Sequence, residues 1–366
     1  MKINIVGSIF GSSGYDSHTR SLANALYKIA DCKLSTQLPQ DWMKHVNDAE
    51  LDMITKTERK EDWNLIISIP HMWQLFTGLG RNMAYVIWEG YECPLSWVEE
   101  MLNPKINLIL TPSEHTKQAI INTCAKWSII HSNSDEHLKI LEKIRIIPHG
   151  HNPKIFYPRE KEQNQPFTFF IDKGWARGWK DRGGLSYLIK SYLEEFTLKD
   201  NVKLLIKINM SYGTNIQQFM NEIKIENKEL PKIEFITQQI PFEKLPEIYK
   251  QANVYCMPSL SESFGLGALQ AMAMGIPCIA NNFGGQIDFI NDKNGILLKE
   301  GKLKHISDEI IYEGILWKEP NIQELRKQMR WAFENQNTIK EMGKQAEEDS
   351  KNWTWDNSAE QIIKAL

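Results

Sequence analysis

The most informative residues for the chemistry of this chain lie between Pro258 and Pro277. The apolar run from Ala252 to Pro258 predicts a buried strand, and a turn rich in serine and glycine leads into an apolar helix that stops at Gly275. Because the first turn of a helix leaves backbone N–H groups unpaired, such a unit can bind an anion. Glu262 lies in the turn, where its carboxylate could accept hydrogen bonds from a hydroxylated ligand. The pattern also fits an ordinary buried αβ unit that binds nothing.

The motif Glu-x-Phe-Gly-Leu at Glu262, followed by a small-residue helix and Gly-x-Pro, resembles a donor-site signature. It is that of the retaining nucleotide-sugar glycosyltransferases, the large group 1 or family-4-like group with the GT-B fold. In that family a first carboxylate contacts the donor sugar and a second, eight positions later, contacts the ribose. The resemblance assigns these roles to Glu262 and to Gln270, whose amide keeps an acceptor oxygen and adds an NH₂ donor. It also assigns four neighbours to the donor: Ser263, Phe264, Gly265 and Leu266.

A donor with two phosphates also needs fixed cations. The segment 173–184 follows a predicted strand and resembles the family's Arg-Lys-Gly stretch, whose basic residues bind the leaving diphosphate. Arg182 stands at the basic position of that stretch, and Lys180 or Arg177 could supply the second charge. Lys207 is a charge at the end of an otherwise apolar strand, where it could bind phosphate or cover the surface with its aliphatic stem.

Gly11 and Gly14 lie between the first predicted strand and the first predicted helix. Glycines there let a backbone approach a phosphate, so we predict a ligand-facing loop; a structural turn is the alternative. The loop is not a full Gly-x-Gly-x-x-Gly, and no acidic residue about 20 positions on completes a dinucleotide site.

Further polar residues follow strands of the first half of the chain, at the strand ends where open αβ sheets bind ligands. The run from Trp88 to Trp97 is similar to acceptor-side segments of bacterial polysaccharide glycosyltransferases. His71 and Glu89 could bind acceptor hydroxyls, and His71 could also contact the transferred sugar, although strand-end histidines often only cap a helix. The acceptor-side candidates are Glu89, Tyr91, Ser113, which is also a natural helix cap, and His149, which precedes a glycine as in the family's linker. We expect Glu262, His71 and Arg182 to act directly in the reaction.

The alternation of strands and helices predicts an α/β protein with parallel sheets. The predicted strands are 2–6, 65–69, 83–88, 108–111, 144–147, 167–171, 202–208, 232–236 and 252–258, and the later helices are 185–196, 242–251 and 357–366. Together with the resemblance, this implies two Rossmann-like domains that face a central cleft. We predict an acceptor-side domain 1–152, a linker 153–166, a nucleotide-sugar domain 167–350 and a closing segment 351–366 that crosses back to the first domain.

The composition and the overall sequence restrict the expected partners, compartment and cofactors of the protein. The net charge of −3 over 366 residues argues against a nucleic-acid partner, and five scattered cysteines predict reduced thiols in a cytoplasm rather than disulfides. The chain begins directly with a strand and has no apolar run of about 20 residues, so we expect neither a signal peptide nor a membrane helix. Without an Asp-x-Asp motif we expect no metal and no cofactor, and cations and helix N–H groups would stabilise the leaving diphosphate.

The prediction is therefore a retaining hexosyl- or related glycosyltransferase, independent of metal, which uses a nucleoside-diphosphate sugar and a glycan or lipid-linked acceptor. We expect it in the cytoplasm, in part at the inner face of the membrane. Two alternatives stay open: a non-catalytic nucleotide-sugar-binding subunit of the same fold, and a nucleotide-sugar epimerase. Binding without turnover would identify the first, and the motif from Glu262 to Pro277 fits a transferase better than the second.

Overall fold

The computed structural model describes residues 1–11, 13–36, 46–57, 60–78, 80–132, 135–160, 165–210, 213–225, 229–307, 312 and 314–366. Part of the predicted linker (161–164) and Ser12 of the glycine loop lie outside the described residues. The chain divides into two compact units. Unit 1 comprises Met1–Gly150, Ser307–Ile315 and Trp353–Leu366, and unit 2 comprises His151–Ile306 and Leu316–Asn352.

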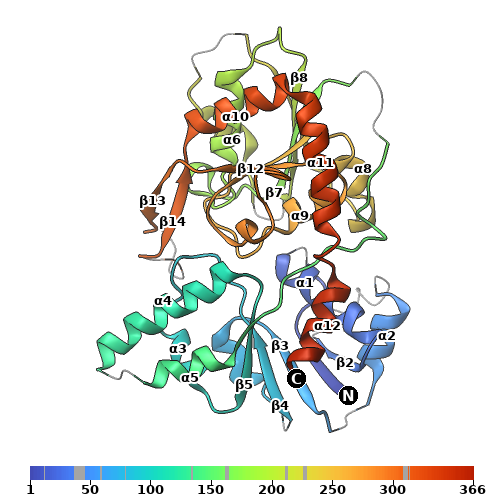
Figure 1. The fold of residues 1–366 in the computed structure, drawn as a ribbon, viewed down its shortest axis with the longest axis vertical. Coiled ribbons are helices and arrows are strands. Elements are labelled where there is room, and N and C mark those ends of the chain that lie inside the picture. The colour runs from blue at the N-terminus through green and yellow to red at the C-terminus, as the bar shows by residue number, and fades with distance from the viewer. Residues whose placement is uncertain are drawn as a thin grey trace. The chain divides into compact units, whose positions relative to one another are not determined.

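Unit 1 is built on a parallel six-stranded sheet in the order β2-β1-β3-β4-β5-β6. Figure 1 shows α3, α4 and α5 on one side of this sheet and α1, α2 and α12 on the other. Strand β3 is buried along its whole length, as expected for an apolar strand covered on both faces. The strands are β1 Lys2–Val6, β2 Asp31–Ser35, β3 Trp63–Ile67, β4 Arg81–Tyr85, β5 Ile106–Thr111 and β6 Ile144–Ile146. The helices are α1 Gly14–Tyr27, α2 Asp48–Thr55, the 3-10 helix η2 Pro70–Leu75, α3 Trp97–Leu102, α4 Glu114–His131, α5 Glu136–Lys143 and α12 Trp355–Ala365.

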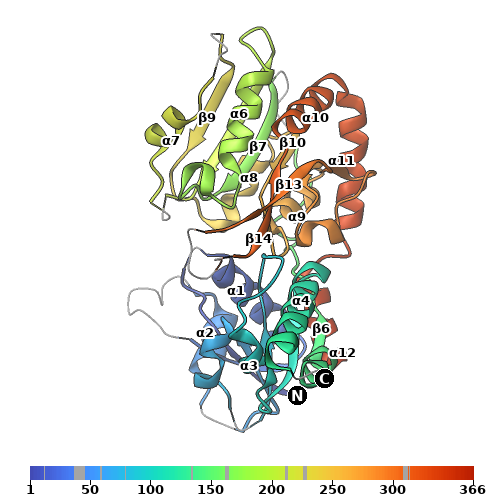
Figure 2. The same cartoon turned by 90° about the vertical axis from the view of Figure 1, so that its left-hand side faces the viewer.

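Unit 2 has a second parallel six-stranded sheet, in the order β12-β11-β10-β7-β8-β9. Figure 2 shows α10 and α11 along one side of this unit. The strands are β7 Phe167–Lys173, β8 Val202–Ile208, β9 Lys232–Ile236, β10 Val254–Met257, β11 Cys278–Asn281 and β12 Gly295–Leu298, with an antiparallel pair β13 Gly301–His305 and β14 Leu316–Pro320 beside them. The helices are η3 Gly178–Lys180, α6 Leu185–Glu195, α7 Ile216–Glu222, η5 Phe242–Lys244, α8 Pro246–Tyr249, α9 Leu266–Ala273, η6 Gly285–Asp288, α10 Ile322–Glu334 and α11 Gln336–Ser350.

The closing segment packs on unit 1, as predicted. Helix α12 lies against α1, and the hydroxyl of Ser358 donates to the carbonyl of Pro148 at 2.6 Å. The helix begins at Trp355, two residues before the predicted start, because Thr354 caps it by accepting from the N–H of Asn357. Gly150 is needed for this packing, since a Cβ there would lie 2.1 Å from the backbone of Thr354 and Trp355.

Most predicted strands are present, with shifted ends. The predicted helix 242–251 is instead the 3-10 turn η5 followed by the short helix α8, because Pro246 cannot donate to a preceding carbonyl. The strand predicted over 65–69 ends at Ile67, and Ile69 lies 37% exposed. Each of the five cysteines is described and buried, and none forms a disulfide. Within the described residues, no helix combines the length and the apolar character that crossing a membrane requires.

Candidate functional site

The order in which the chain adds strands to the sheet of unit 2 reverses at β7. The chain runs from β7 outward through β8 and β9 and then returns to the other side of β7 as β10. Ligands of open αβ sheets bind beyond the carboxyl ends of the strands at such a switch point. Lys173 is the last residue of β7, and the turn that holds Glu262 follows β10. The strand order therefore brings these two segments together.

Glu262 lies between two cations at this switch point. One carboxylate oxygen accepts from the ammonium of Lys173, and the other is 3.1 Å from Nη1 of Arg182. Nη1 of Arg182 also donates to the carbonyl of Ser261 at 2.7 Å. Burial alone would raise the pKa of Glu262, but the charges of Lys173 and Arg182 outweigh it and lower this pKa to about 2. Glu262 is therefore ionised at neutral pH although only 8% of it is exposed.

Backbone contacts hold the loop after β7 against the loop after β10. The carboxylate of Asp181 accepts from the N–H groups of Ala176 and Gly183, each at 2.8 Å. The N–H of Leu260 donates to the carbonyl of Arg182 at 2.8 Å. Gly184 has φ +72°, and a Cβ there would lie 2.2 Å from the carbonyl oxygen of Pro258, so no other residue fits without a shift. These contacts hold the backbone at Arg182 beside the turn that contains Glu262.

The other predicted cations occupy different surroundings. Lys207 is buried at the end of β8, with Nζ 3.8 Å from a carboxylate oxygen of Asp172. Burial raises the pKa of Asp172, while the charges of Lys207 and Lys173 oppose this rise. Lys180 is exposed on η3. Sequence reasoning missed Lys173 as a ligand candidate, and the available signal was a lysine at the last position of a strand.

The predicted donor turn leads into α9 through Gly265, which has φ +102°. Phe264 is buried and packs on Phe289 with ring centroids 5.0 Å apart. A second loop that the sequence analysis missed lies against this turn, because the N–H of Gly285 donates to the carbonyl of Glu262 at 2.8 Å. A Cβ on Gly285 would lie 2.1 Å from the carbonyl oxygen of Ser263. The available signal was a pair of glycines, Gly284 and Gly285, four positions after the apolar run that ends at Ala280.

Gln270 is buried on α9 and contacts one of two stacked tyrosines. Its Oε1 accepts from the hydroxyl of Tyr249 at 3.3 Å, and Tyr249 stacks on Tyr255 with centroids 5.8 Å apart. One acceptor site of the amide is thus occupied within the unit. The assignment of Gln270 to a ribose stays a prediction.

The glycine loop of unit 1 has a carboxylate at its centre. Asp16 accepts from Ser8 and Ser13, and Ser13 and Asp16 form a capping box at the start of α1. A Cβ on Gly11 would lie 2.3 Å from Oδ2 of Asp16, so Gly11 is required by this contact. A Cβ on Gly14 would have no atom within 4 Å, so packing among the described residues does not require a glycine there.

The acceptor-side candidates are spread over unit 1. His71 is exposed on η2, with Nε2 3.3 Å from the hydroxyl of Ser96. Glu89 is 9% exposed, and its carboxylate accepts from the hydroxyl of Tyr312. Tyr91 is 40% exposed. Ser113 is buried and caps α4, as predicted, by accepting from the N–H of Thr116.

His149 lies in a buried aromatic cluster of unit 1. Its ring is 4.4 Å from that of His18 and 5.5 Å from that of Trp355, and Tyr85 completes the cluster. Burial lowers the pKa of His149 to about 3. Its packing is that of a core residue, and its role toward a ligand stays a prediction.

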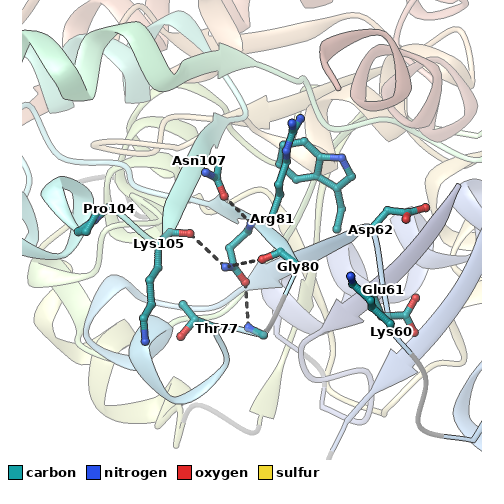
Figure 3. A pocket seen from close by; sticks show the side chains of 12 residues that line it. Lys60, Glu61, Asp62, Thr77, Gly80, Arg81, Pro104, Lys105 and Asn107 are labelled. Carbon is teal, nitrogen blue, oxygen red and sulfur yellow. Dashed lines mark hydrogen bonds between the residues drawn. The ribbon is translucent and has the colours of Figure 1, made fainter.

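A cavity of about 930 Å³ lies at a different place in unit 1 (Figure 3). Its lining includes Trp63 and Arg81, the first residues of β3 and β4, and Lys105 just before β5. It therefore lies at the amino ends of the strands, and none of the predicted site residues lines it. Within the described residues there is also no group of three or more histidine, cysteine or acidic side chains that could hold a metal ion.

Residues 182–349 match the model of one protein family, described as "Glycosyl transferases group 1". A capsular polysaccharide biosynthesis glycosyltransferase, CapM of Staphylococcus aureus, is 28% identical over 200 residues, which are 52% of this chain and 50% of CapM. A D-inositol 3-phosphate glycosyltransferase of Corynebacterium diphtheriae is 30% identical over 132 residues, which are 36% of this chain and 26% of that relative. The chain thus spans at most about half the length of these relatives.

Several solved structures match the whole chain, among them those of a sucrose-phosphate synthase and of HepE. The sucrose-phosphate synthase of Thermosynechococcus elongatus matches with a TM-score of 0.66 at 16% identity, over 100% of this chain and 98% of that one. Anabaena HepE in complex with UDP-glucose matches with a TM-score of 0.67 at 12% identity, over 100% and 99%. The predicted fold class, two Rossmann-like domains with a closing helix on the first, is thereby confirmed.

Proposed function

Because residues 182–349 match the model of the group 1 glycosyltransferases, we propose that the protein transfers a sugar from a nucleoside-diphosphate sugar to a hydroxyl acceptor. One observation carries the proposal: Glu262 of the family motif meets Lys173 and Arg182 at the switch point of unit 2. The side chains of Glu262, Lys173 and Arg182 together carry one net positive charge. A diphosphate is the ligand that such a site favours.

The geometry suits the departure of a nucleoside diphosphate. Negative charge develops on the leaving phosphate in the transition state, and fixed donors stabilise it without having to reorganise. Lys173 and Arg182 would supply these donors, together with the N–H groups at the start of α9. No divalent metal is required in this scheme.

Glu262 would bind the donor sugar rather than transfer a proton. A carboxyl group with a pKa of about 2 is ionised at neutral pH and is a poor general acid or base there. As a carboxylate it accepts hydrogen bonds from sugar hydroxyls. We propose that the acceptor hydroxyl attacks from the side of the leaving group, so that the anomeric configuration is retained without a carboxylate nucleophile.

The choice of donor and acceptor to test follows from the similarity of this chain to HepE and CapM. Since HepE was crystallised with UDP-glucose, a UDP-sugar is the first donor to test. CapM acts in capsular polysaccharide biosynthesis, which supports a glycan or lipid-linked acceptor and a place in the cytoplasm at the inner face of the membrane.

The test begins with donor binding. Thermal unfolding is measured with UDP-, GDP-, ADP- and dTDP-sugars, because a ligand of the folded state raises the apparent stability. Transfer from the stabilising donor to a panel of p-nitrophenyl glycosides is then measured with excess EDTA, where we expect activity to persist. Binding without transfer to any acceptor or to water would favour a non-catalytic subunit, and activity that needs added metal would overturn the metal-free scheme.

A matched pair of variants locates the phosphate site. Lys173→Met should weaken UDP binding by about tenfold or more, because a charge-assisted hydrogen bond contributes about 1.5–3 kcal/mol. Lys203→Met is the control, since Lys203 lies near the other end of the sheet, on β8, and pairs with Glu234. Equal UDP affinities of wild type and Lys173→Met, measured by calorimetric titration, would remove Lys173 from the site.

A further inference from the structure

Three basic side chains line the cavity at the amino ends of β3, β4 and β5 in unit 1, namely those of Lys60, Arg81 and Lys105. In the part of the chain that the structure describes, none of their charged groups has an ion pair or a hydrogen bond. Two acidic side chains, those of Glu61 and Asp62, also line the cavity but do not pair with these cations. Three cations and two carboxylates leave the lining with one net positive charge, and the three cations remain available to a ligand.

The direction of the Arg81 side chain is set by Trp63. The two residues pair in register on β4 and β3, and Cζ of Arg81 lies 5.5 Å from the centroid of the Trp63 ring, a cation–π contact. Trp63 is 7% exposed, so the guanidinium lies against a ring that is itself held in place. A cation–π contact leaves the five N–H donors of a guanidinium to other partners. Arg81 is therefore a preorganised donor for a phosphate, whose oxygens match its planar fork.

The backbone around the cavity is held by the buried side chain of Asn82. Its Oδ1 accepts from the N–H of Gly78 at 3.0 Å, and its Nδ2 donates to the carbonyls of Gly80 at 3.2 Å and Lys105 at 3.0 Å. The N–H of Asn82 donates to Oδ1 of Asn107 at 2.8 Å, which leaves the NH₂ group of Asn107 available at the cavity (Figure 3). These bonds join the start of β4 to the segment of Lys105, so the lining is largely formed before a ligand binds.

A buried donor beside the same lining has no partner. Asn64 is 3% exposed, and its Oδ1 accepts from the side-chain amide of Asn4 at 3.3 Å, but its Nδ2 forms no hydrogen bond within the described residues. A Cβ on Gly78, which lines the cavity, would lie 2.5 Å from this nitrogen. The wall therefore has an excess of N–H donors, which suits a ligand rich in acceptor oxygens.

The spacing of the three cations restricts the ligand. They precede or begin three neighbouring strands, and since neighbouring strands lie about 4.8 Å apart, the outer two strands are about 10 Å apart. Lys60 and Lys105 therefore stand on either side of Arg81, as Figure 3 shows. One phosphate group does not span this width, whereas two phosphate groups on one molecule can. The volume of about 930 Å³ accommodates such a molecule, because small-molecule sites measure about 300–1,000 Å³.

An acceptor in the lining adds a second requirement. One carboxylate oxygen of Asp62 accepts from the N–H of Lys2 at 2.8 Å, and the other has no hydrogen-bond partner among the described residues, so it can accept from a hydroxyl group. We propose that the cavity binds a sugar with two phosphate groups, with Lys60 and Lys105 on different phosphates and Arg81 between them. Substrates of open αβ sheets bind at the carboxyl ends of the strands, so this site is separate from the proposed transfer reaction and does not depend on it.

The first test is calorimetric titration of the whole protein with fructose 1,6-bisphosphate and with glucose 1,6-bisphosphate. We expect at least one of them to bind with a Kd of about 1 mM or lower in dilute buffer, and to bind more weakly in about 300 mM salt, which screens exposed cations. Inorganic phosphate, which cannot bridge the cations, and fructose, which has no charge, should bind at least about tenfold more weakly. Failure of both bisphosphates to bind, or equal affinity for inorganic phosphate, would overturn the inference.

The second test locates the bound sugar. Arg81→Gln should raise the Kd of the bisphosphate by about tenfold or more, because the charge-assisted bonds of the guanidinium are lost. Lys105→Gln leaves the contact of Arg81 with Trp63 intact and should raise the Kd by about threefold, as expected for an exposed charge. Lys139→Gln is the matched control, because Lys139 is exposed on α5 of the same unit and does not line the cavity. An unchanged Kd in Lys105→Gln and in a folded Arg81→Gln would contradict the proposal.

The third test excludes the phosphate site proposed in unit 2. The affinity for the bisphosphate should be the same in Lys173→Met as in the wild type, and the same with and without saturating UDP. Loss of bisphosphate binding in Lys173→Met, or its displacement by UDP, would assign the ligand to unit 2 and overturn the inference. Absence of UDP binding would instead count against the proposed function, and the cavity variants would still decide the role of the cavity.

Discussion

Replacing Glu262 by glutamine should destabilise unit 2 in a way that depends on pH. The carboxyl pKa is lowered from 4.5 to about 2 in the folded protein. At about 1.4 kcal/mol per pKa unit, the ionised carboxylate contributes about 3 kcal/mol to folding. Glutamine keeps the size of the side chain and removes the charge. Lys173 and Arg182 would then lose the negative charge that lies between them, although side-chain exposures of 18% and 32% leave both partly hydrated.

The direction of the pH effect follows from linkage. A carboxyl group whose pKa is lowered on folding stabilises the protein fully above its unfolded pKa of 4.5, and this contribution disappears as the pH falls toward 2. The variant should therefore be less stable than the wild type by about 3 kcal/mol at pH 7 and by about 2 kcal/mol at pH 3.5. Urea unfolding at both pH values, followed by fluorescence and circular dichroism together, measures the two differences.

Two further results decide the interpretation. Glu247→Gln is the control, because Glu247 pairs with Lys250 and Arg159 on the surface and should change the free energy of unfolding little. Glu262→Gln should also keep or improve its affinity for UDP, since both cations become available to phosphate, while transfer falls by about tenfold or more through the lost sugar contact. A difference in stability that is the same at pH 7 and pH 3.5, or a loss of UDP affinity, would refute the reasoning.

Two other predictions concern buried polar residues. Gln270→Leu should weaken UDP binding by about tenfold in calorimetric titration, because the ribose hydroxyls would lose a hydrogen-bond partner. Gln270→Glu keeps an acceptor for Tyr249 and should keep the affinity for UDP. Unaltered affinity of the Leu variant would make Gln270 a packing residue. His149, with its pKa lowered to about 3, takes up a proton near pH 6.5 only when unfolded, so its neutral form stabilises the protein fully above pH 6.5 and less as the pH falls below that. The free energy of unfolding of the wild type should fall by about 2 kcal/mol through this group between pH 7 and pH 5. The free energy of unfolding of His149→Asn should fall less steeply over the same range. Equal slopes would contradict the burial of His149.

The sequence analysis predicted strands β1, β3 to β6 and β7 to β10 and missed β2, β11, β12, β13 and β14. Strand β2 has only Cys32 and Leu34 as apolar residues, and Lys33 is buried between them. Strand β11 has four residues and ends in Asn281, which is buried because its amide donates to the carbonyls of Ser259 and Lys318. Strand β13 is exposed along its whole length. Tertiary hydrogen bonds and pairing with neighbouring strands make these segments strands, and a local sequence pattern does not reveal such contacts.

The candidate site was predictable where its residues belong to short local motifs. Glu262 and Arg182 follow from local patterns, and the structure brings them together. Lys173 does not, because its importance depends on β10 pairing with β7 instead of β9, and no local pattern contains that choice. The bond between Tyr312 and Glu89 joins residues 223 positions apart, so it is equally invisible in the sequence.

The two units differ in the charge at the helix that follows their glycine-bearing turns, and this difference supports placing the nucleotide in unit 2. At the start of α1 the carboxylate of Asp16 accepts from the N–H of Ser13 and from two hydroxyls, and these bonds lower its pKa despite the opposing effect of burial. A diphosphate at α1 would have to displace or approach an ionised carboxylate. At α9 the first turn has no acidic residue, and the nearby carboxylate of Glu262 is outnumbered by Lys173 and Arg182. Since the dipole of both helices favours an anion at this end, the neighbouring side chains decide between them. Under the proposed function, the diphosphate is therefore expected at α9 rather than at α1.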